Sequence, residues 1–281
     1  MIIWLASYPK SGNTLLRSIL GTYFFSDDGN FDFKYTYQIG QFPSLVYFEK
    51  KGIDINDNNE IFKNYLAAQT LLNQQNRSIK FFKTHSAFFD RKTDNAKFSN
   101  SENTLGAVYV VRDPRNIVSS FAHHYQLSID EATDQMCNKD LFSKRTDIHP
   151  ETFISSWKLN YLSWSGLQKK VLIIKYEDLV GDNKKKTVMK VFDFFKSLGM
   201  SQKSFNIAKL NKVLKSTEFS KMKELEKKHG FKEATIDDKT GKRLTFFNRG
   251  PKNNWMDQLD SKNREKIENA FGKEMKDLGY L

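Results

Sequence analysis

Four side chains have types and spacing that could do chemistry together: Lys10, Lys83, His85 and Arg112. Each comes shortly after a short apolar run of the chain. Lysine and arginine bind anions such as phosphate and sulfate, and a neutral imidazole can accept a proton from a hydroxyl group. The set therefore predicts an anion-binding site with a candidate general base beside it, provided that the fold brings the four together.

The apolar runs are short and nearly continuous, which is typical of buried parallel strands. They cover residues 2–6, 79–82, 107–111 and 171–174. Amphipathic stretches, with apolar residues three and four apart, separate the runs and predict helices. These stretches cover residues 60–73, 114–126, 151–167, 184–198 and 261–278. The alternation predicts an α/β fold of three layers, with a central, mostly parallel sheet and helices on both faces. Ligands of such sheets bind at the carboxyl ends of the strands.

The first strand is followed by a loop of small and basic residues and then by a run with helical spacing. The N–H groups that open a helix lack internal acceptors and carry the positive end of its dipole, and Gly12 lets the backbone approach a ligand closely. We therefore predict a phosphate-binding loop after the first strand, reinforced by Lys10. An ordinary capped surface turn is the alternative. The loop is not a Walker A motif, because Lys10 precedes Gly12 instead of following a glycine.

The second strand end places Lys83 and His85 at the ligand edge of the sheet. His85 is a candidate general base, and Lys10 and Lys83 nearby would lower the pKa of its imidazole and keep it neutral. A structural, hydrogen-bonded histidine is the alternative. The other four histidines lie in helical or polar stretches, and we assign them solvated or structural roles: His123, His124, His149 and His229.

The third strand ends in Arg112, followed by Asp113 and Pro114, which are typical of the cap and first residue of a helix. Ser120 lies nearly two helical turns further on, where its hydroxyl could reach an anion held by the guanidinium. Pairing of Arg112 with a surface carboxylate is the alternative. A late loop with glycine and proline, residues 248–252, carries further basic side chains and could fold over a ligand.

Composition limits the class of protein. The 281 residues carry 45 Lys and Arg against 33 Asp and Glu, a formal net charge of +12, so we expect an anionic partner. The hydrophobic share of 39% is enough for a sizeable core, and we expect one domain over residues 1–281. The single cysteine, Cys137, cannot form an internal disulfide, and no apolar run approaches the length of a membrane span. We therefore expect a cytoplasmic protein.

Taken in chain order, five motifs resemble those of the cytosolic-type sulfotransferase family. They are Y-P-K-S-G-N-T at 8–14, K-T-H at 83–85, V-V-R-D-P-R-N at 110–116, Y-E-D-L at 176–179 and R-G-P-K-N-N-W at 249–255. The resemblance implies a single α/β domain with a parallel sheet. It also implies transfer of a sulfuryl group from 3'-phosphoadenosine 5'-phosphosulfate (PAPS) to an acceptor, with 3',5'-adenosine bisphosphate (PAP) as the product.

The resemblance also implies a role for each matching residue. The residues that hold the 5'-phosphate of the donor are Ser11, Gly12, Asn13 and Thr14. Those at its 3'-phosphate are Arg112 and Ser120, over which Arg249 and Gly250 close, and the adenine-side residue is Tyr176. The catalytic residues are Lys10 at the bridging oxygen, Lys83 at the sulfuryl group and His85 as the base. No metal is expected to take part.

Three features depart from the family pattern. Leu15 stands where the family usually has a tryptophan that stacks on adenine, so Phe246 or Phe247 is expected to serve instead. In the late loop Arg249 is the only basic match before the glycine. The dimer motif found near the C-terminus of many animal members is not visible after Trp255, so the family's homodimer is not carried over.

The residues do not identify the acceptor, for which a small molecule or a saccharide is expected. The aromatic-rich stretch 23–48 and residues 86–89 could line an apolar acceptor pocket, although core packing explains them equally well.

Two other functions stay open from the residues alone. One is a non-catalytic protein that binds a nucleotide or nucleic acid, which the gathering of basic residues at loops after strands disfavours. The other is a nucleotide kinase-like phosphotransferase, which is disfavoured because Asp113 is the only carboxylate at the basic strand ends.

Overall fold

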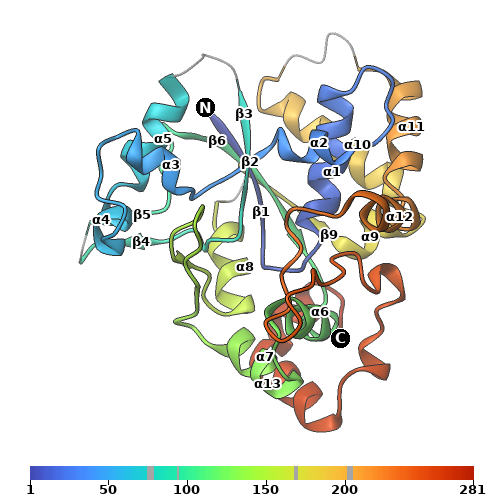
Figure 1. Ribbon diagram of the computed structural model, residues 1–281. Coiled ribbons are helices and arrows are strands. Elements are labelled where there is room, and N and C mark those ends of the chain that lie inside the picture. Colours follow the sequence, from blue (N-terminus) through green and yellow to red (C-terminus); the bar gives the residue numbers. More distant parts are fainter. Residues whose placement is uncertain (75–78, 94, 168–169, 201–204) are drawn as a thin grey trace.

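The computed structural model describes residues 1–74, 79–93, 95–167, 170–200 and 205–281. Its centre is a five-stranded sheet in the order β2-β3-β1-β6-β9 (Figure 1). The strands are β1 (Ile2–Ser7), β2 (Gly40–Gln41), β3 (Lys80–Thr84), β6 (Thr104–Val111) and β9 (Val171–Lys175). Every pair in this sheet is parallel, as the sequence predicts, and only the short edge strand β2 was not anticipated.

The strand ends that carry the predicted site residues meet at one edge of the sheet. Ala6 of β1 pairs with Thr84 of β3, and Ser7 pairs with Val110 of β6. The loop after β1, the segment after β3 and the end of β6 therefore leave the sheet side by side, because parallel strands present their carboxyl ends in the same direction.

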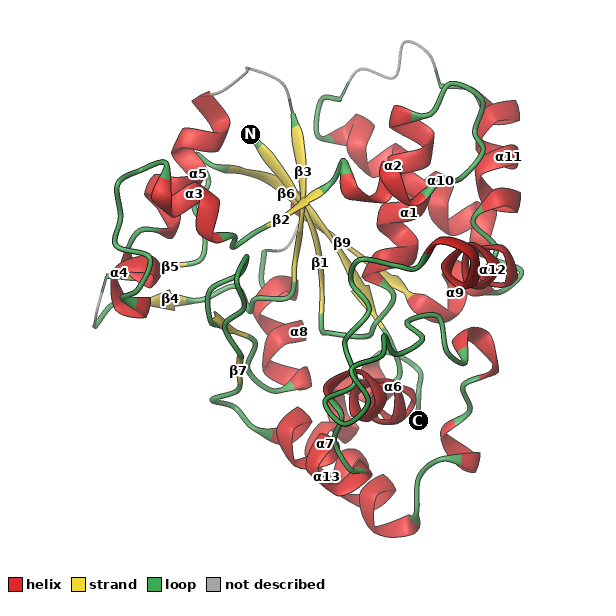
Figure 2. Ribbon diagram, viewed as in Figure 1, coloured by secondary structure: helices red, strands yellow, loops and turns green. Residues whose placement is uncertain are grey.

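Helices cover both faces of the sheet and complete the predicted three layers (Figure 2). Their bounds are α1 Asn13–Phe25, α2 Phe33–Tyr37, α3 Leu45–Glu49, α4 Asn58–Lys63, α5 Tyr65–Gln74, α6 Pro114–Tyr125, α7 Ile129–Cys137, α8 Trp157–Ser165, α9 Tyr176–Val180, α10 Lys184–Ser197, α11 Ile207–Ser216, α12 Phe219–His229 and α13 Ser261–Asp277. Two short antiparallel pairs lie outside the main sheet, β4 (Asp90–Arg91) with β5 (Ala96–Lys97) and β7 (Phe142–Ser143) with β8 (Thr152–Phe153). Two 3-10 turns follow α12, at Gly250–Lys252 and Trp255–Asp257.

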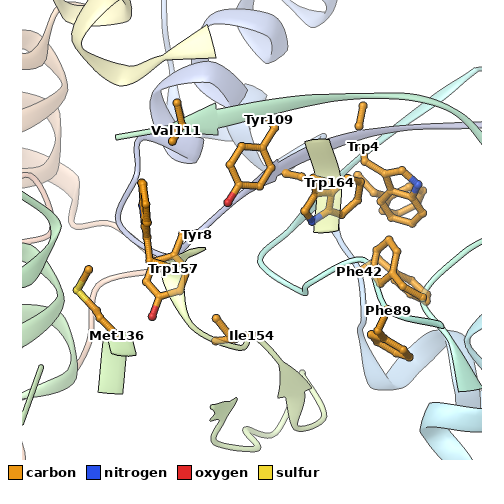
Figure 3. Packing of buried hydrophobic residues seen from close by; sticks show 14 of the residues in the cluster. Trp4, Tyr8, Phe42, Phe89, Tyr109, Val111, Met136, Ile154, Trp157 and Trp164 are labelled. Atoms are coloured by element: carbon orange, nitrogen blue, oxygen red, sulfur yellow. The ribbon is translucent and has the colours of Figure 1, made fainter. Parts of the chain in front are cut away.

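Side chains of β1 point alternately into two hydrophobic clusters, one on each face. Ile2 and Trp4 face the cluster built with α6, α7, α8 and α13, which Figure 3 shows from close by. Ile3 and Leu5 face the cluster built with α1, α10 and α11. All six residues of β1 are buried, so this strand is anchored from both sides and holds the loop that follows it in place.

Two predicted helices differ from the structure. The stretch 60–73 is two helices, α4 and α5, because the side chain of Asn64 donates to the carbonyl of Glu60 at 2.8 Å and helps end α4 there. The stretch 151–167 begins with the strand β8, and the helix starts only after Ser156, whose hydroxyl accepts from the Leu159 N–H and caps it. Local spacing alone cannot separate these short elements from the helices beside them.

A membrane span was not expected, and no helix in the described part of the chain is long and apolar enough to cross a bilayer.

Candidate active site

The loop between β1 and α1 is shaped by two residues with left-handed backbone angles, Lys10 (φ 65°) and Gly12 (φ 101°). A Cβ atom on Gly12 would lie 2.4 Å from Cδ2 of Tyr176, so glycine alone fits at this turn. α1 begins directly afterwards at Asn13, and its first N–H groups have no acceptor within the helix. The loop therefore has the backbone geometry of an anion seat.

The side chains of this loop are not equivalent. The Asn13 amide donates to the carbonyl of Leu5 at 2.8 Å and to the Ser7 hydroxyl at 3.3 Å, so it ties the loop to β1. Asn13 can therefore offer a ligand its backbone N–H but not its side-chain N–H. The Ser11 hydroxyl is buried and has no hydrogen-bond partner among the described residues.

Lys10 is a partly buried cation whose ammonium lies 4.0 Å from the centre of the Phe246 ring. Burial, followed by the charges of Lys83 and Arg112, lowers its pKa to about 7. The cost of holding this charge away from water would be relieved by an anion, so Lys10 is poised to bind one.

His85 is held in one tautomer. Its Nδ1 lies 2.8 Å from the carbonyl oxygen of Ser7, and because a carbonyl can only accept, Nδ1 carries the hydrogen and donates. The Nε2 atom therefore keeps its lone pair, and it has no hydrogen-bond partner in the described part of the chain. Burial, and then the charge of Lys83, lowers the pKa of His85 to about 3, as predicted in direction. The imidazole is neutral at physiological pH and can accept a proton through Nε2.

Lys83 is held by a carboxylate that the sequence analysis missed. Its ammonium lies 3.3 Å from Oε2 of Glu233, and Oε1 of the same carboxylate lies 2.8 Å from the buried guanidinium of Arg17. Despite burial, these two cations hold the pKa of Glu233 well below its usual range. The network leaves one net positive charge beside His85.

Arg112, at the start of the segment after β6, lies against the β1–α1 loop. Its Nη1 donates to the carbonyl of Lys10 at 3.0 Å, and its guanidinium lies 4.4 Å from the centre of the Tyr176 ring. Its Nε is buried and has no partner among the described residues. The predicted cap is present, since Asp113 accepts from the Arg115 N–H, and Asp113 also binds the Arg115 side chain.

Ser120, predicted to reach the same anion as Arg112, lies on α6, where its hydroxyl accepts a long hydrogen bond of 3.4 Å from the Asn253 amide. Asn253 belongs to the segment after the first 3-10 turn, so this bond joins the late loop to α6.

Residues 230–250, called the flap below, join α12 to the late loop. A buried carboxylate on α12 fixes the end of the flap, because Glu226 accepts from the N–H groups of Phe246 at 2.6 Å and Phe247 at 2.9 Å. Of the two aromatic candidates for the adenine, Phe246 lies on Lys10, whereas Phe247 is 7% exposed and packs in a third cluster with Phe231 and Met222.

A further aromatic side chain, Phe219 at the start of α12, lines the cavity. A Cβ atom on Gly250 would lie 2.3 Å from the Phe219 ring, so the late loop closes directly over this ring. The sequence analysis did not single out Phe219, because a phenylalanine at the start of an amphipathic helix has no local signal that separates it from core.

One cavity of about 1740 Å³ unites the predicted residues. Those that line it are Lys10, Gly12, Asn13, Thr14, Lys83, His85, Arg112, Ser120, Tyr176, Arg249 and Gly250. Ser11 is fully buried and does not line it. Among the described residues no group of three or more His, Cys, Asp or Glu side chains is placed to hold a metal ion.

Only some of the residues expected to line an acceptor pocket line the cavity. From the stretch 23–48 the cavity is lined by Tyr37, Gln41, Phe42 and Pro43, whereas Phe88 and Phe89 pack in the core beside Phe98.

Three histidines for which the sequence predicts solvated or structural roles also line the cavity: His123, His124 and His149. Nδ1 of His124 lies 3.0 Å from the Thr235 hydroxyl of the flap, and burial lowers the pKa of His124 to about 2. An alternation of polar and apolar residues on a helix does not reveal which neighbour will cover its polar side.

A comparison with known protein families gives a match over nearly the whole chain. A model of the sulfotransferase domain matches residues 2–279. The chain belongs to the sulfotransferase family. The prediction of a sulfotransferase with an α/β fold is therefore confirmed, and the match covers nearly the whole chain.

Solved structures agree on the fold of this sulfotransferase. The mouse sulfotransferase SULT7A1 complexed with PAP superposes with a TM-score of 0.61 at 20% identity, covering 99% of this chain and 86% of that one. Retinol dehydratase, solved with retinol and PAP, gives a TM-score of 0.63 at 16% identity and covers 98% and 81%. Its complex with androsterone and PAP gives 0.60 at 16% identity with the same coverage. No curated protein matches the chain by sequence.

Proposed function

We propose that this sulfotransferase moves the sulfuryl group of PAPS to a hydroxyl or amine of an acceptor, in the cytoplasm and without a metal. The observation that carries the proposal is a single cavity with two anion seats, the β1–α1 loop and Arg112, and the lone pair of His85 beside them. PAPS has two anionic ends, so one nucleotide would engage both seats. The PAP complexes of the mouse sulfotransferase and of retinol dehydratase support this choice of donor.

The residues fit such a nucleotide. Backbone N–H groups of residues 12–14 would hold the 5'-phosphate, where a side chain on Gly12 would collide with Tyr176. The buried Nε of Arg112 lacks a partner among the described residues, and a 3'-phosphate would supply one. Ser120, Arg249 and Gly250 would complete the 3' end, and Tyr176 the adenine side, with Phe219 as a further aromatic neighbour.

The reaction needs no covalent enzyme intermediate. The acceptor oxygen attacks sulfur as its proton passes to Nε2 of His85, and the bond from sulfur to the bridging oxygen breaks, so that PAP leaves with that oxygen. Lys10 would offset the charge that develops on the leaving phosphate, and Lys83 the charge on the sulfuryl oxygens. Placement of these cations in a buried site supplies most of the expected acceleration.

For the acceptor we propose a small molecule or a saccharide. Retinol dehydratase, with the same fold, was solved with the small molecules retinol and androsterone. In this chain the part of the cavity beyond His85 mixes apolar Phe42 with polar Gln41 and His149. It would admit an acceptor with both kinds of surface.

Two experiments test the proposal. PAP should raise the thermal midpoint of unfolding, and ATP should raise it less, because a ligand that binds only the native state stabilises it. Equal protection by ATP and PAP would count against a site for a 3'-phosphorylated nucleotide and favour a kinase-like phosphotransferase.

The second experiment follows transfer of labelled sulfuryl groups from PAPS to acceptors in a cell extract. His85→Ala should lower the rate by about 10²-fold to 10⁴-fold, as expected for loss of a general base, while PAP binding changes little. The matched control is His229→Ala, an exposed histidine outside the cavity lining, which should keep the wild-type rate. Full activity in His85→Ala would remove His85 as the base.

A further inference from the structure

The positive charge of this chain is concentrated in one quarter of it. Residues 182–252 contain nineteen lysines and arginines against eight aspartates and glutamates, so they hold eleven of the twelve surplus charges. This segment comprises α10, α11, α12 and the flap, and Figure 1 shows the three helices grouped to one side of the sheet, near α1.

The charge is not neutralised by ion pairs. Within the described residues, no lysine or arginine of 182–252 forms an ion pair, and Glu233 is the one carboxylate of the segment that does, with Arg17 and Lys83 outside it. The rest of the chain is different, since Lys262 and Lys266 of α13 pair with Asp130 and Asp134 of α7. Unpaired charges project a field into solvent, whereas paired ones largely cancel.

Some of the basic residues of this segment lie at the rim of the cavity, at the end where the proposed donor would bind. Lys184, Lys185, Lys215 and Arg249 line the cavity, and apart from Lys184 these side chains are exposed. Two carboxylates, Asp182 and Glu218, line the same end, so four positive charges face two negative ones. Burial lowers the pKa of Lys184 only to about 8, so it also stays charged at neutral pH.

We propose that Lys185 and Lys215 form a capture surface that draws the donor nucleotide into the cavity. The inference rests on the proposed donor, whose two phosphate-bearing ends make it strongly anionic. A cleft whose lining carries an excess of charge of one sign focuses its field and raises the association rate of an oppositely charged ligand, by about 10-fold to 10³-fold in strongly charged clefts. The surface acts before contact, and Arg112 and the β1–α1 loop hold the nucleotide afterwards.

Two double variants with the same change of charge test whether the association rate depends on where the lysines lie. The test variant is Lys185→Glu/Lys215→Glu, and the control is Lys196→Glu/Lys228→Glu, which makes the same change of charge at exposed residues outside the cavity lining. Lys196 lies eleven residues after Lys185 on α10, about 16 Å along the helix. That separation exceeds the Debye length of about 10 Å at about 0.1 M salt.

The association and dissociation rates of PAP are measured by surface plasmon resonance on the immobilised protein at low and high salt. At about 0.1 M salt the test pair should lower the association rate about 10-fold, while the control pair lowers it less than about 2-fold. Dissociation should change less than about 2-fold in both, and the difference between the pairs should shrink at about 1 M salt.

The outcomes separate this inference from the proposed function. Wild-type protein that does not bind PAP contradicts both. If PAP binds and the two pairs lower the association rate equally, overall charge is responsible and the capture surface is excluded. If the test pair changes only the dissociation rate, the two lysines contact bound nucleotide, and the inference is again wrong.

Discussion

At the scale of single residues, Gly12 is a position where only glycine fits the backbone and its neighbours. Gly12→Ala should abolish the PAP-dependent rise in the unfolding midpoint, because its Cβ would lie 2.4 Å from Tyr176 at a φ of 101°. The unfolding free energy should fall by about 1–3 kcal/mol, as for other strained backbone positions. Chemical denaturation with and without PAP measures both effects.

The control for Gly12→Ala is Gly199→Ala. Gly199 has a similar φ of 87°, but a Cβ there would meet nothing within 4 Å. Gly199→Ala should therefore lower the unfolding free energy only through its strained backbone angle. It should keep the full PAP-dependent rise in the unfolding midpoint. Retention of PAP binding in Gly12→Ala would show that the loop can move away from Tyr176.

Lys10 should make nucleotide binding depend on pH. Its pKa is lowered to about 7 in the free protein, so its charge is present below that pH and lost above it. A bound phosphate favours the charged form and raises this pKa, so PAP affinity should fall as pH rises from about 7.5 to 9, by up to about 10-fold per unit. Titration calorimetry over this range measures the slope.

His85 should not contribute to that slope. Its pKa is lowered to about 3, so it is already neutral throughout the range. Lys10→Arg keeps its charge over the same range and should bind PAP with a shallower pH profile, whose remaining slope comes from Lys184 with its pKa of about 8. A slope in Lys10→Arg equal to that of the wild type would assign the titration to another group.

At the scale of elements, the flap depends on one buried carboxylate of α12. Glu226→Ala removes the acceptor of the Phe246 and Phe247 N–H groups, each bond to a charged group being worth about 1.5–3 kcal/mol. We expect faster protease cleavage within the flap and PAP binding weakened about 10-fold. Limited proteolysis with mass spectrometry locates the cleavage.

The control for the flap is Glu224→Ala, an exposed position on the same helix. It removes the same charge without touching the flap, so cleavage should stay at the wild-type rate. Slow cleavage in Glu226→Ala would mean that the contacts of Glu233 with Arg17 and Lys83 suffice to hold the flap.

At the scale of the whole molecule, we propose that residues 1–281 unfold as one domain, because β1 contributes to the clusters on both faces of the sheet. Phe98→Ala in one cluster and Phe195→Ala in the other should each cost about 3–5 kcal/mol and lower the midpoint of one transition. Calorimetry that resolves two transitions in either variant would indicate two domains.

How far the sequence predicts this protein depends on the range of the interactions involved. The four long strands, the loop at Gly12 and the cap at Asp113 are each encoded by neighbouring residues, because backbone angles respond to side chains a few positions away. The parallel order of those strands then follows, since helical connections must return the chain to the same side, and it brings Lys10, His85 and Arg112 together.

The contacts that complete the site come from the tertiary structure. Glu233 meets Arg17 across 216 residues of sequence and Lys83 across 150, and Thr235 meets His124 across 111. No local pattern predicts these partners, because the sequence near a charged or polar residue does not show whether another element will cover it. Such a residue is therefore expected to be exposed to solvent. The sequence by itself therefore determined the strands, the glycine turn after the first strand and the identity of the side chains proposed to react. Only the packing of the flap over the sheet edge decided how those side chains are buried, paired and held neutral or charged, since burial and pairing depend on residues far apart in the chain.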